Sequence, residues 1–333
     1  MFICMSAAEL RTAGLSEYDI LRAEKCCLRR VRRGIYVVTK SCAVDAHRFV
    51  SNVAADDATD LPRETEGQLK RNEDLRILVR SYVGKILPHA VFSHRSALII
   101  HGLAVPYIEH ERDVFAESVH QRCGLRRPSM QVRRRSLDER DIVRVDGIPV
   151  TSVLRTLFDL ARDYPLALAV AAIDDALHRS VITEAQLQTY VADHPVRTRQ
   201  RRIDTVMENV DGRRESVGES ITAVRFVEFS VPGVEPQVVI VDENGRFVAR
   251  TDFANRQAKV VAEFDGAGKY HLKGVDPKKA FEQERRREYA LRNLGYEVFR
   301  LTWQDLFAAT QFLRIKAAIE RRTPPRPVRS TAG

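Results

Sequence analysis

The order of helical and strand patterns in the last third of the chain constrains the fold most strongly. A helical pattern near 216–229 is followed by three strand patterns, a long helix, a fourth strand and a closing helix. The predicted strands are 237–241, 247–253, 258–265 and 297–301, and the later helices are 277–294 and 303–321. Asn244-Gly245 joins the first two strands, because this dipeptide favours the tight turn of a β-hairpin. The sequence therefore predicts an αβββαβα unit.

The N-terminal residues follow the order of a winged helix-turn-helix. Ser6 with Glu9 and Ser16 with Asp19 have the capping-box spacing that begins a helix. A basic hairpin over 29–38 comes next. The order of two helices and a basic hairpin is typical of a DNA-binding module.

In such a module the second helix enters the major groove, and the hairpin meets phosphate or the minor groove. The candidate base readers on the second helix are Ser16, Glu17, Tyr18 and Arg22. The predicted wing contacts are Arg29, Arg30, Arg32 and Arg33. A net charge of +9 over 333 residues agrees with a polyanionic partner. The alternative is that the basic hairpin is a solvated sheet edge.

Acidic residues gather near the ends of two predicted strands in the last third. Asp252 ends one strand, while Glu263 and Asp265 are two apart on the next and so share a face. Carboxylates there are costly unless paired, and a divalent cation, Mg²⁺ or Mn²⁺, is a natural partner. Lys269 follows and suits stabilisation of a phosphate, and Glu219 is a further carboxylate. The alternative is that these acids are solvated residues that begin a turn.

Residues 215–306 resemble the very-short-patch-repair-type endonuclease domain of the PD-(D/E)XK superfamily. The matching motifs, in order, are Glu215-Ser216-x-Gly218-Glu219-Ser220, Pro236-Gln237, Gly245-Arg246-Phe247, Asp252-Phe253, Glu263-Phe264-Asp265-Gly266-x-x-Lys269-Tyr270, Glu284-Arg285-x-Arg287-Glu288 and Leu294-Gly295-Tyr296-x-Val298-x-Arg300-x-Thr302-Trp303-x-Asp305-Leu306. The resemblance implies a restriction-endonuclease-like αβββαβ domain that hydrolyses DNA phosphodiesters with Mg²⁺.

The resemblance places Asp252 and Glu263 on the metal-ligand positions, with Asp265 and Lys269 assisting. Arg287 either orients this site or contacts DNA phosphate, and a surface ion pair is its alternative role. The chain also departs from the pattern. Asp265 stands where the superfamily usually has lysine, Thr222-Ala223 replaces a Ser-Arg pair, and Asn255 replaces an aromatic residue. These departures indicate either an altered substrate or a site that has lost activity.

Residues 6–38 resemble the N-terminal winged helix of the abortive-infection type IV antitoxin family. The residues that carry this resemblance are Leu10, Gly14-Leu15-Ser16, Ile20 and Leu28-Arg29-Arg30-Val31-Arg32-Arg33-Gly34-Ile35-Tyr36. The region 93–160 follows the same antitoxin-like pattern through Ser93-His94-x-Ser96-Ala97, His101-Gly102-Leu103 and Asp146-Gly147-Ile148-Pro149-Val150-Thr151-Ser152. The resemblance implies a DNA-binding regulator with a cognate toxin as partner.

These patterns together predict an α+β multidomain protein. The expected regions are a winged helix-turn-helix over 1–42, a linker over 43–68, a mixed α/β region over 69–195, a PD-(D/E)XK nuclease-like domain over 215–322 and a disordered tail over 323–333. Within the mixed region, Asp146-Gly147 predicts a hairpin turn, and helices are expected at 152–162, 165–179 and 183–192. The arginine-rich stretch 196–214 is expected to mark the boundary before the last domain. The leading hypothesis is a DNA-binding protein with a metal-dependent endonuclease domain. The alternative is a non-catalytic antitoxin-type transcriptional regulator that uses the nuclease fold for homodimerisation or DNA binding.

The five cysteines, at positions 4, 26, 27, 42 and 123, predict reduced thiols rather than a disulfide framework. Cys26 and Cys27 are adjacent, which suits no common zinc spacing, so zinc is the less favoured alternative. The sequence contains no window near the ~18 apolar residues that a membrane span needs. The N-terminus lacks a signal-peptide pattern, so we expect a cytoplasmic protein without a membrane partner.

Overall fold

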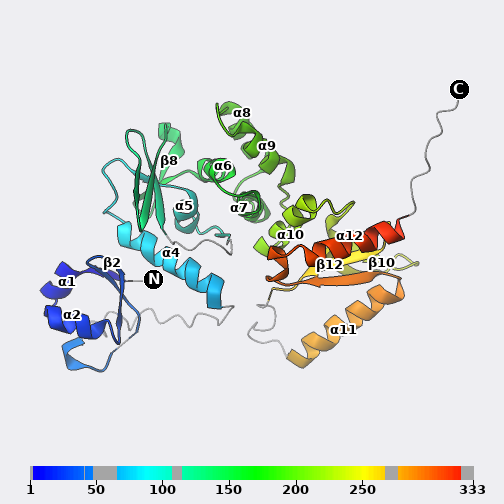
Figure 1. Ribbon diagram of the computed structural model, residues 1–333, viewed down its shortest axis with the longest axis horizontal. Coiled ribbons are helices and arrows are strands. Elements are labelled where there is room, and N and C mark those ends of the chain that lie inside the picture. The colour runs from blue at the N-terminus through cyan, green and yellow to red at the C-terminus, as the bar shows by residue number, and fades with distance from the viewer. Residues whose placement is uncertain (1–2, 41, 48–65, 107–114, 267–276, 324–333) are drawn as a thin grey trace. The chain divides into compact units, whose positions relative to one another are not determined.

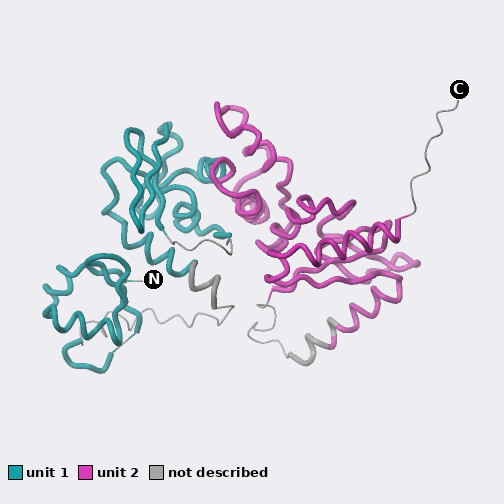
Figure 2. Tube along the Cα trace, viewed as in Figure 1, with its two compact units in different colours: residues 1–159 teal, residues 160–333 magenta. Residues whose placement is uncertain are grey.

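Three β-sheets, each accompanied by helices, organise the computed structural model (Figure 1). The structure describes residues 3–40, 42–47, 66–106, 115–266 and 277–323. The chain divides into two compact units, Met1–Asp159 and Leu160–Gly333 (Figure 2). The predicted α+β, multidomain class is confirmed at this level.

The N-terminal sheet is a basic hairpin extended by a short first strand. Its elements are β1 (Cys4–Ser6), α1 (Ala7–Thr12), α2 (Glu17–Ala23), β2 (Leu28–Arg32) and β3 (Ile35–Val38). The strands are antiparallel in the order β1-β3-β2. Both predicted capping boxes are confirmed, Ser6 with Glu9 at α1 and Ser16 with Asp19 at α2. Strand β1 was not predicted, because its three residues are too few to show an alternating pattern.

The middle sheet has six strands in the order β6-β7-β5-β4-β9-β8. They are β4 (Val91–Phe92), β5 (Ala116–His120), β6 (Leu125–Arg127), β7 (Met130–Arg134), β8 (Ile142–Val145) and β9 (Ile148–Thr151). The pairs β4–β9 and β5–β7 are parallel and the other pairs are antiparallel. Helices α4 (Glu66–Tyr82) and α5 (His94–Ile100) belong to the same unit. The predicted Asp146-Gly147 hairpin is confirmed, with φ of 49° and 75° at its two central residues.

Four helices follow the middle sheet in the chain. They are α6 (Val153–Asp163), α7 (Leu166–His178), α8 (Glu184–Asp193) and α9 (Gln200–Asn209). The first three agree with the sequence prediction to within two residues at each end. Helix α9 lies in the arginine-rich stretch 196–214, for which the sequence predicts a boundary and no helix. Ile203 and Val206, three apart on one helical face, are buried, and α9 packs against α7.

The C-terminal sheet has four strands in the order β10-β11-β12-β13. The elements of this region are α10 (Val217–Glu228), β10 (Glu235–Val241), β11 (Phe247–Asn255), β12 (Val260–Phe264), α11 (Pro277–Asn293), β13 (Glu297–Leu301) and α12 (Thr310–Arg322). The first three strands are antiparallel to their neighbours, whereas β12 and β13 are parallel. The predicted αβββαβα order is therefore confirmed.

Helices cover both faces of this sheet (Figure 1). Phe253 and Phe264 point to the face that α10 and α12 cover, where Phe226 and Phe312 complete an aromatic core. Val261, on the opposite face of β12, packs with a core that α11 contributes to. Successive strand residues point to opposite faces, so β12 is buried along its whole length.

The predicted closing helix at 303–321 is broken into two parts. A 3-10 turn, η4 (Asp305–Phe307), precedes α12, because the Asp305 carboxylate accepts hydrogen bonds from the backbone N–H and hydroxyl of Thr302. The predicted tail beyond 323, Lys269 and most of the predicted linker lie outside the described residues. Residues 45–47 of that linker form a 3-10 turn. In the part of the chain with described structure, no helix has the length and apolar character needed to cross a membrane.

Candidate nucleic-acid interface and acidic site

Helix α2 presents an exposed face with an aromatic ring beside a cation. Ile20 and Ala23 are buried, so the opposite side of the helix faces outward. Tyr18 is 67% exposed and Leu21 is 61% exposed. The Arg22 guanidinium lies 5.7 Å from the centroid of the Tyr18 ring. The structure thus brings two of the predicted base readers together.

Ser16 holds the start of this helix. Its hydroxyl accepts a hydrogen bond from the backbone N–H of Asp19 at 3.2 Å and donates one to the Asp19 carboxylate at 2.6 Å. The hydrogen bonds that the Ser16 hydroxyl and backbone N–H donate to the Asp19 carboxylate keep the pKa of Asp19 below its usual value. The predicted base reader Ser16 therefore already has a structural partner within α2.

Two of the four predicted wing arginines contact α4. The Arg29 guanidinium donates to the Asp74 carboxylate at 2.7 Å. Arg32 donates to the hydroxyl and the carbonyl of Ser81, at 3.0 and 2.6 Å. Its guanidinium also lies 4.2 Å from the centroid of the Tyr82 ring. These two side chains join the hairpin to α4.

A β-bulge separates these arginines from the other two. Residues three apart on a regular strand point to opposite faces, but the β2–β3 register shifts between Arg30 and Arg32. The extra residue lets Arg29 and Arg32 reach the same helix. Arg30 and Arg33 are exposed and have no ion-pair partner among the described residues. They are the predicted wing arginines that remain accessible to a polyanion.

The acidic pair of the C-terminal sheet meets across two antiparallel strands. Phe253 of β11 lies opposite Ala262 of β12, and the next step of this register places Asp252 opposite Glu263. Glu263 is 5% exposed. The Asp252 carboxylate accepts a hydrogen bond from the backbone N–H of Phe264 at 2.8 Å. The antiparallel register therefore places Asp252 and Glu263 on neighbouring strands, side by side.

Arginines surround Glu263. The Arg287 guanidinium, on α11, lies 2.7 Å from one carboxylate oxygen of Glu263, and Arg300, on β13, lies 3.9 Å from the other. Arg300 also lies 3.7 Å from the Asp265 carboxylate. Two cations thus stabilise the charge of this nearly buried acid. Arg287 is thus ion-paired with Glu263, as the alternative to a DNA contact predicted.

Glu219 is bound within its own helix start and to β10. Its carboxylate accepts hydrogen bonds from the backbone N–H of Glu215 at 3.0 Å, the hydroxyl of Ser216 at 2.8 Å and the amide of Gln237 at 2.7 Å. Within the described ranges, the carboxylates of Asp252, Glu263, Asp265 and Glu219 do not bring three ligand atoms within 4.8 Å of one another.

Two residues that depart from the endonuclease pattern, Asn255 and Thr222, make local hydrogen bonds. The Asn255 amide donates to the carbonyl of Pro232 at 3.0 Å, and its oxygen accepts from the backbone N–H of Ala258 at 2.8 Å. The buried Thr222 hydroxyl donates to the carbonyl of Gly218 at 2.7 Å. Both side chains therefore stabilise local backbone where the endonuclease pattern has other residue types.

A buried ion-pair network in the middle sheet was missed by the sequence analysis. Glu117 on β5 is fully buried, and Arg133 and Arg95 lie 2.6 and 3.3 Å from its two carboxylate oxygens. The Ser96 hydroxyl accepts from the backbone N–H of Glu117 at 2.7 Å. The sequence feature that could have indicated this network is Glu117 itself, a single carboxylate within a short strand pattern. Such an acid needs a paired cation when it is buried.

Residues 90–205 match the family model described as the AbiEi antitoxin C-terminal domain. The match begins beside β4, contains the Glu117 network and extends through most of α9. No curated protein and no solved structure matches the chain. The endonuclease resemblance of residues 215–306 finds no support in these comparisons. The chain therefore contains a component similar to an antitoxin domain.

Proposed function

We propose that this protein is a DNA-binding regulator of the antitoxin type. The observation that carries the proposal is the similarity of residues 90–205 to an antitoxin domain. The lobe that precedes this region offers an exposed helix face and accessible arginines, as a nucleic-acid-binding module requires. A DNA-binding regulator therefore replaces the metal-dependent endonuclease as the leading hypothesis.

In the proposed complex the N-terminal lobe acts as a winged helix, with α2 in the major groove and the β2–β3 hairpin as the wing. Tyr18 and Arg22 contact base edges, and Arg30 and Arg33 contact phosphates. Arg29 and Arg32 fix the hairpin against α4 and so act as positioning residues. A cognate toxin is the proposed protein partner, and self-association to a homodimer would match a two-fold DNA site.

The test is selection of genomic duplex fragments by the full-length protein, followed by fluorescence anisotropy on the selected sequence. Tyr18→Ala and Arg22→Ala are each expected to weaken specific binding by about 5- to 150-fold, because a base contact is worth ~1–3 kcal/mol. Arg126→Ala, which removes an exposed arginine on β6, is the matched control and is expected to bind like the wild type.

Two results would contradict the proposal. One is a wild-type protein that binds every duplex equally. The other is a selected site whose affinity is insensitive to both α2 variants. Circular dichroism of each variant distinguishes lost contacts from a lost fold.

The second candidate function is metal-dependent hydrolysis of a DNA phosphodiester by the C-terminal sheet. The αβββαβα order and the cross-strand placement of Asp252 and Glu263 favour it. In this candidate, Asp252 and Glu263 hold Mg²⁺ or Mn²⁺, with Glu219 as a further ligand, and Asp265 and Lys269 assist at the phosphate. It ranks second because Arg287 already neutralises Glu263, so a metal ion competes with an existing ion pair.

A plasmid-nicking assay with Mg²⁺ or Mn²⁺ tests this candidate. An active nuclease loses cleavage in Glu263→Ala and in EDTA but keeps it in Glu243→Ala, a control that removes an exposed acid. If the wild-type protein binds duplex DNA but cleaves no form of DNA, the nuclease function is contradicted. The result would agree with the regulator function.

A further inference from the structure

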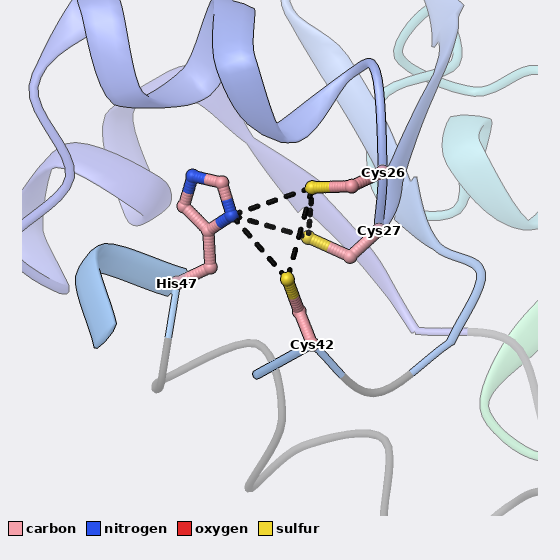
Figure 3. A group of neighbouring side chains, drawn as sticks. All are labelled: Cys26, Cys27, Cys42 and His47. Carbon is pink, nitrogen blue, oxygen red and sulfur yellow. Dashed lines mark hydrogen bonds between the residues drawn. The ribbon is translucent and has the colours of Figure 1, made fainter. Parts of the chain in front are cut away.

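Three cysteines and a histidine converge beside the C-terminal end of α2 (Figure 3). Cys26 and Cys27 lie between α2 and β2. Cys42 follows β3, and His47 closes the 3-10 turn η1 (Asp45–His47). The four residues thus come from three separate places in the first 47 residues of the chain. The cysteine spacing alone does not predict the fourth member of this group, His47.

The ligand atoms of this Cys/His cluster are close to equidistant. Nδ1 of His47 lies 3.4, 3.8 and 3.6 Å from the sulfur atoms of Cys26, Cys27 and Cys42. The Cys26 sulfur lies 3.6 Å from that of Cys27 and 3.7 Å from that of Cys42. All four atoms lie within 4.8 Å of one another.

These distances are those of a tetrahedral zinc site. Zinc binds sulfur at ~2.3 Å and imidazole nitrogen at ~2.0 Å, so its tetrahedron has sulfur–sulfur edges of about 3.8 Å and sulfur–nitrogen edges of about 3.5 Å. The five measured edges fall between 3.4 and 3.8 Å. Side chains on separate segments have no covalent reason to adopt this spacing, and a shared central ion supplies one.

Hydrogen bonding and disulfide formation account for the cluster less well. One imidazole nitrogen has a single donor or acceptor position, yet Nδ1 faces three sulfur atoms (Figure 3). A disulfide joins only two sulfurs, at ~2.0 Å, and would leave the third thiol and the imidazole unexplained. A metal ion binds all four atoms at once.

We propose that Cys26, Cys27, Cys42 and His47 form a structural zinc site. Thiolate sulfur and imidazole nitrogen favour zinc over the hard cations, which prefer oxygen ligands. Four protein ligands complete the tetrahedron and leave no position for water, which is the pattern of structural rather than catalytic zinc. Cys27 and His47 are buried, at 0% and 2% exposure, so the ion is shielded from solvent on that side.

The site cross-links the N-terminal lobe around the exposed helix. Cys26 and Cys27 tie the end of α2, while Cys42 and His47 tie the segment that follows the hairpin. Zinc therefore fixes α2 relative to the β2–β3 hairpin, and the residues proposed to contact DNA lie on these two elements. Metal binding itself does not depend on that proposal, since it is measured without DNA.

The experiment measures metal in full-length protein purified under reducing conditions without chelator. Plasma mass spectrometry is expected to find about one zinc per chain. Exchange with Co²⁺ is expected to produce a thiolate-to-cobalt charge-transfer band and the intense visible bands of tetrahedral cobalt. Cys42→Ser and His47→Gln are each expected to bind zinc at least about 100-fold more weakly in competition with a chromophoric chelator.

Cys123→Ser is the matched control. Its sulfur lies 3.3 Å from Nδ1 of His120, so it tests whether an isolated Cys–His contact accounts for any zinc. This variant is expected to keep about one zinc per chain. If the cluster variants fail to fold, the zinc content and cobalt spectrum of the wild type still decide. Wild-type protein without zinc that takes up cobalt without a thiolate band overturns the proposal, as does a disulfide among these cysteines in freshly reduced protein.

Discussion

Gly218 of α10 lies directly against Phe264, the last residue of β12. An added Cβ at this position would lie 2.0 Å from Cε1 of Phe264. The Phe264 ring is buried and packs edge-on against Trp303, with the ring centroids 5.1 Å apart. The ring therefore has little freedom to move away from a new methyl group.

Gly218→Ala is accordingly expected to lower the free energy of unfolding by about 1–3 kcal/mol, the usual cost of overpacking a filled core. Gly124→Ala is the control, because its added Cβ would meet only ordinary contacts of 3.5 Å or more. Urea denaturation followed by circular dichroism measures both variants. Equal stability of the two would show that α10 shifts at no cost.

The buried carboxylate of Glu117 is compensated by two arginines from other elements. A carboxylate with no exposed surface requires compensating charge, which Arg95 supplies from α5 and Arg133 from β7. Neither arginine is near Glu117 in the sequence, so the network exists only once α5, β5 and β7 have assembled. It joins β5 to α5 and β7 within the region that is similar to the antitoxin domain.

At the scale of elements, the start of α2 depends on reciprocal hydrogen bonds between Ser16 and Asp19. Ser16→Ala removes the hydroxyl that accepts from the backbone, and loss of such a cap costs ~1 kcal/mol. Thermal unfolding of the variant is expected at a lower temperature, whereas Ser16→Thr, which keeps a hydroxyl, is expected to stay close to the wild type. An unchanged melting temperature in Ser16→Ala would mean that α2 is held by packing alone.

The same cap predicts a pH dependence. Hydrogen bonds from Ser16 hold the pKa of Asp19 below its usual value, so the ionised carboxylate stabilises the folded lobe. This contribution is complete above the unfolded-state pKa of about 3.9 and is lost as the pH falls through the lower folded-state value. The stability difference between wild type and Ser16→Ala should therefore shrink in that acidic window. Melting curves at a series of pH values check the expectation.

The basic hairpin illustrates how one irregularity changes an element. Four arginines in five residues of sequence look equivalent, and alternation predicts that neighbours on a strand point to opposite faces. Because of the bulge in β2, Arg29 and Arg32 both contact α4, whereas Arg30 and Arg33 remain exposed. Which arginines contact α4 and which are exposed is therefore set by the pairing of β2 with β3 and by the position of α4.

At the scale of the molecule, the excess positive charge predicts salt-sensitive DNA binding. Each phosphate contact adds about one to the slope of log affinity against log salt. Arg30→Ala/Arg33→Ala is expected to reduce that slope by about two and to weaken binding to all duplexes similarly. Arg126→Ala/Arg127→Ala removes the same charge from the exposed β6 and is the control. Equal slopes in the two double variants would place the phosphate contacts elsewhere than the hairpin.

The division of the whole chain follows packing rather than composition. The compact units separate after Asp159, within the region that the sequence pattern grouped as 69–195. The arginine-rich stretch 196–214 contains α9, in which Ile203 and Val206 are buried. A few apolar residues at helical spacing outweigh many charged ones, because the charged side chains remain in solvent on the outer face.

The sequence by itself determined the local features of this protein. These features are the capping boxes at Ser6 and Ser16, the Asp146-Gly147 hairpin and the αβββαβα order. Each depends on residues that are close together in the chain, so the sequence pattern predicts it. Only the tertiary structure decided which acids are paired, which wing arginines are accessible and that His47 joins three cysteines. These contacts join segments that are far apart in the sequence and that come together only after a bulge, a sheet or a turn has formed. Residue spacing along the chain therefore does not predict them.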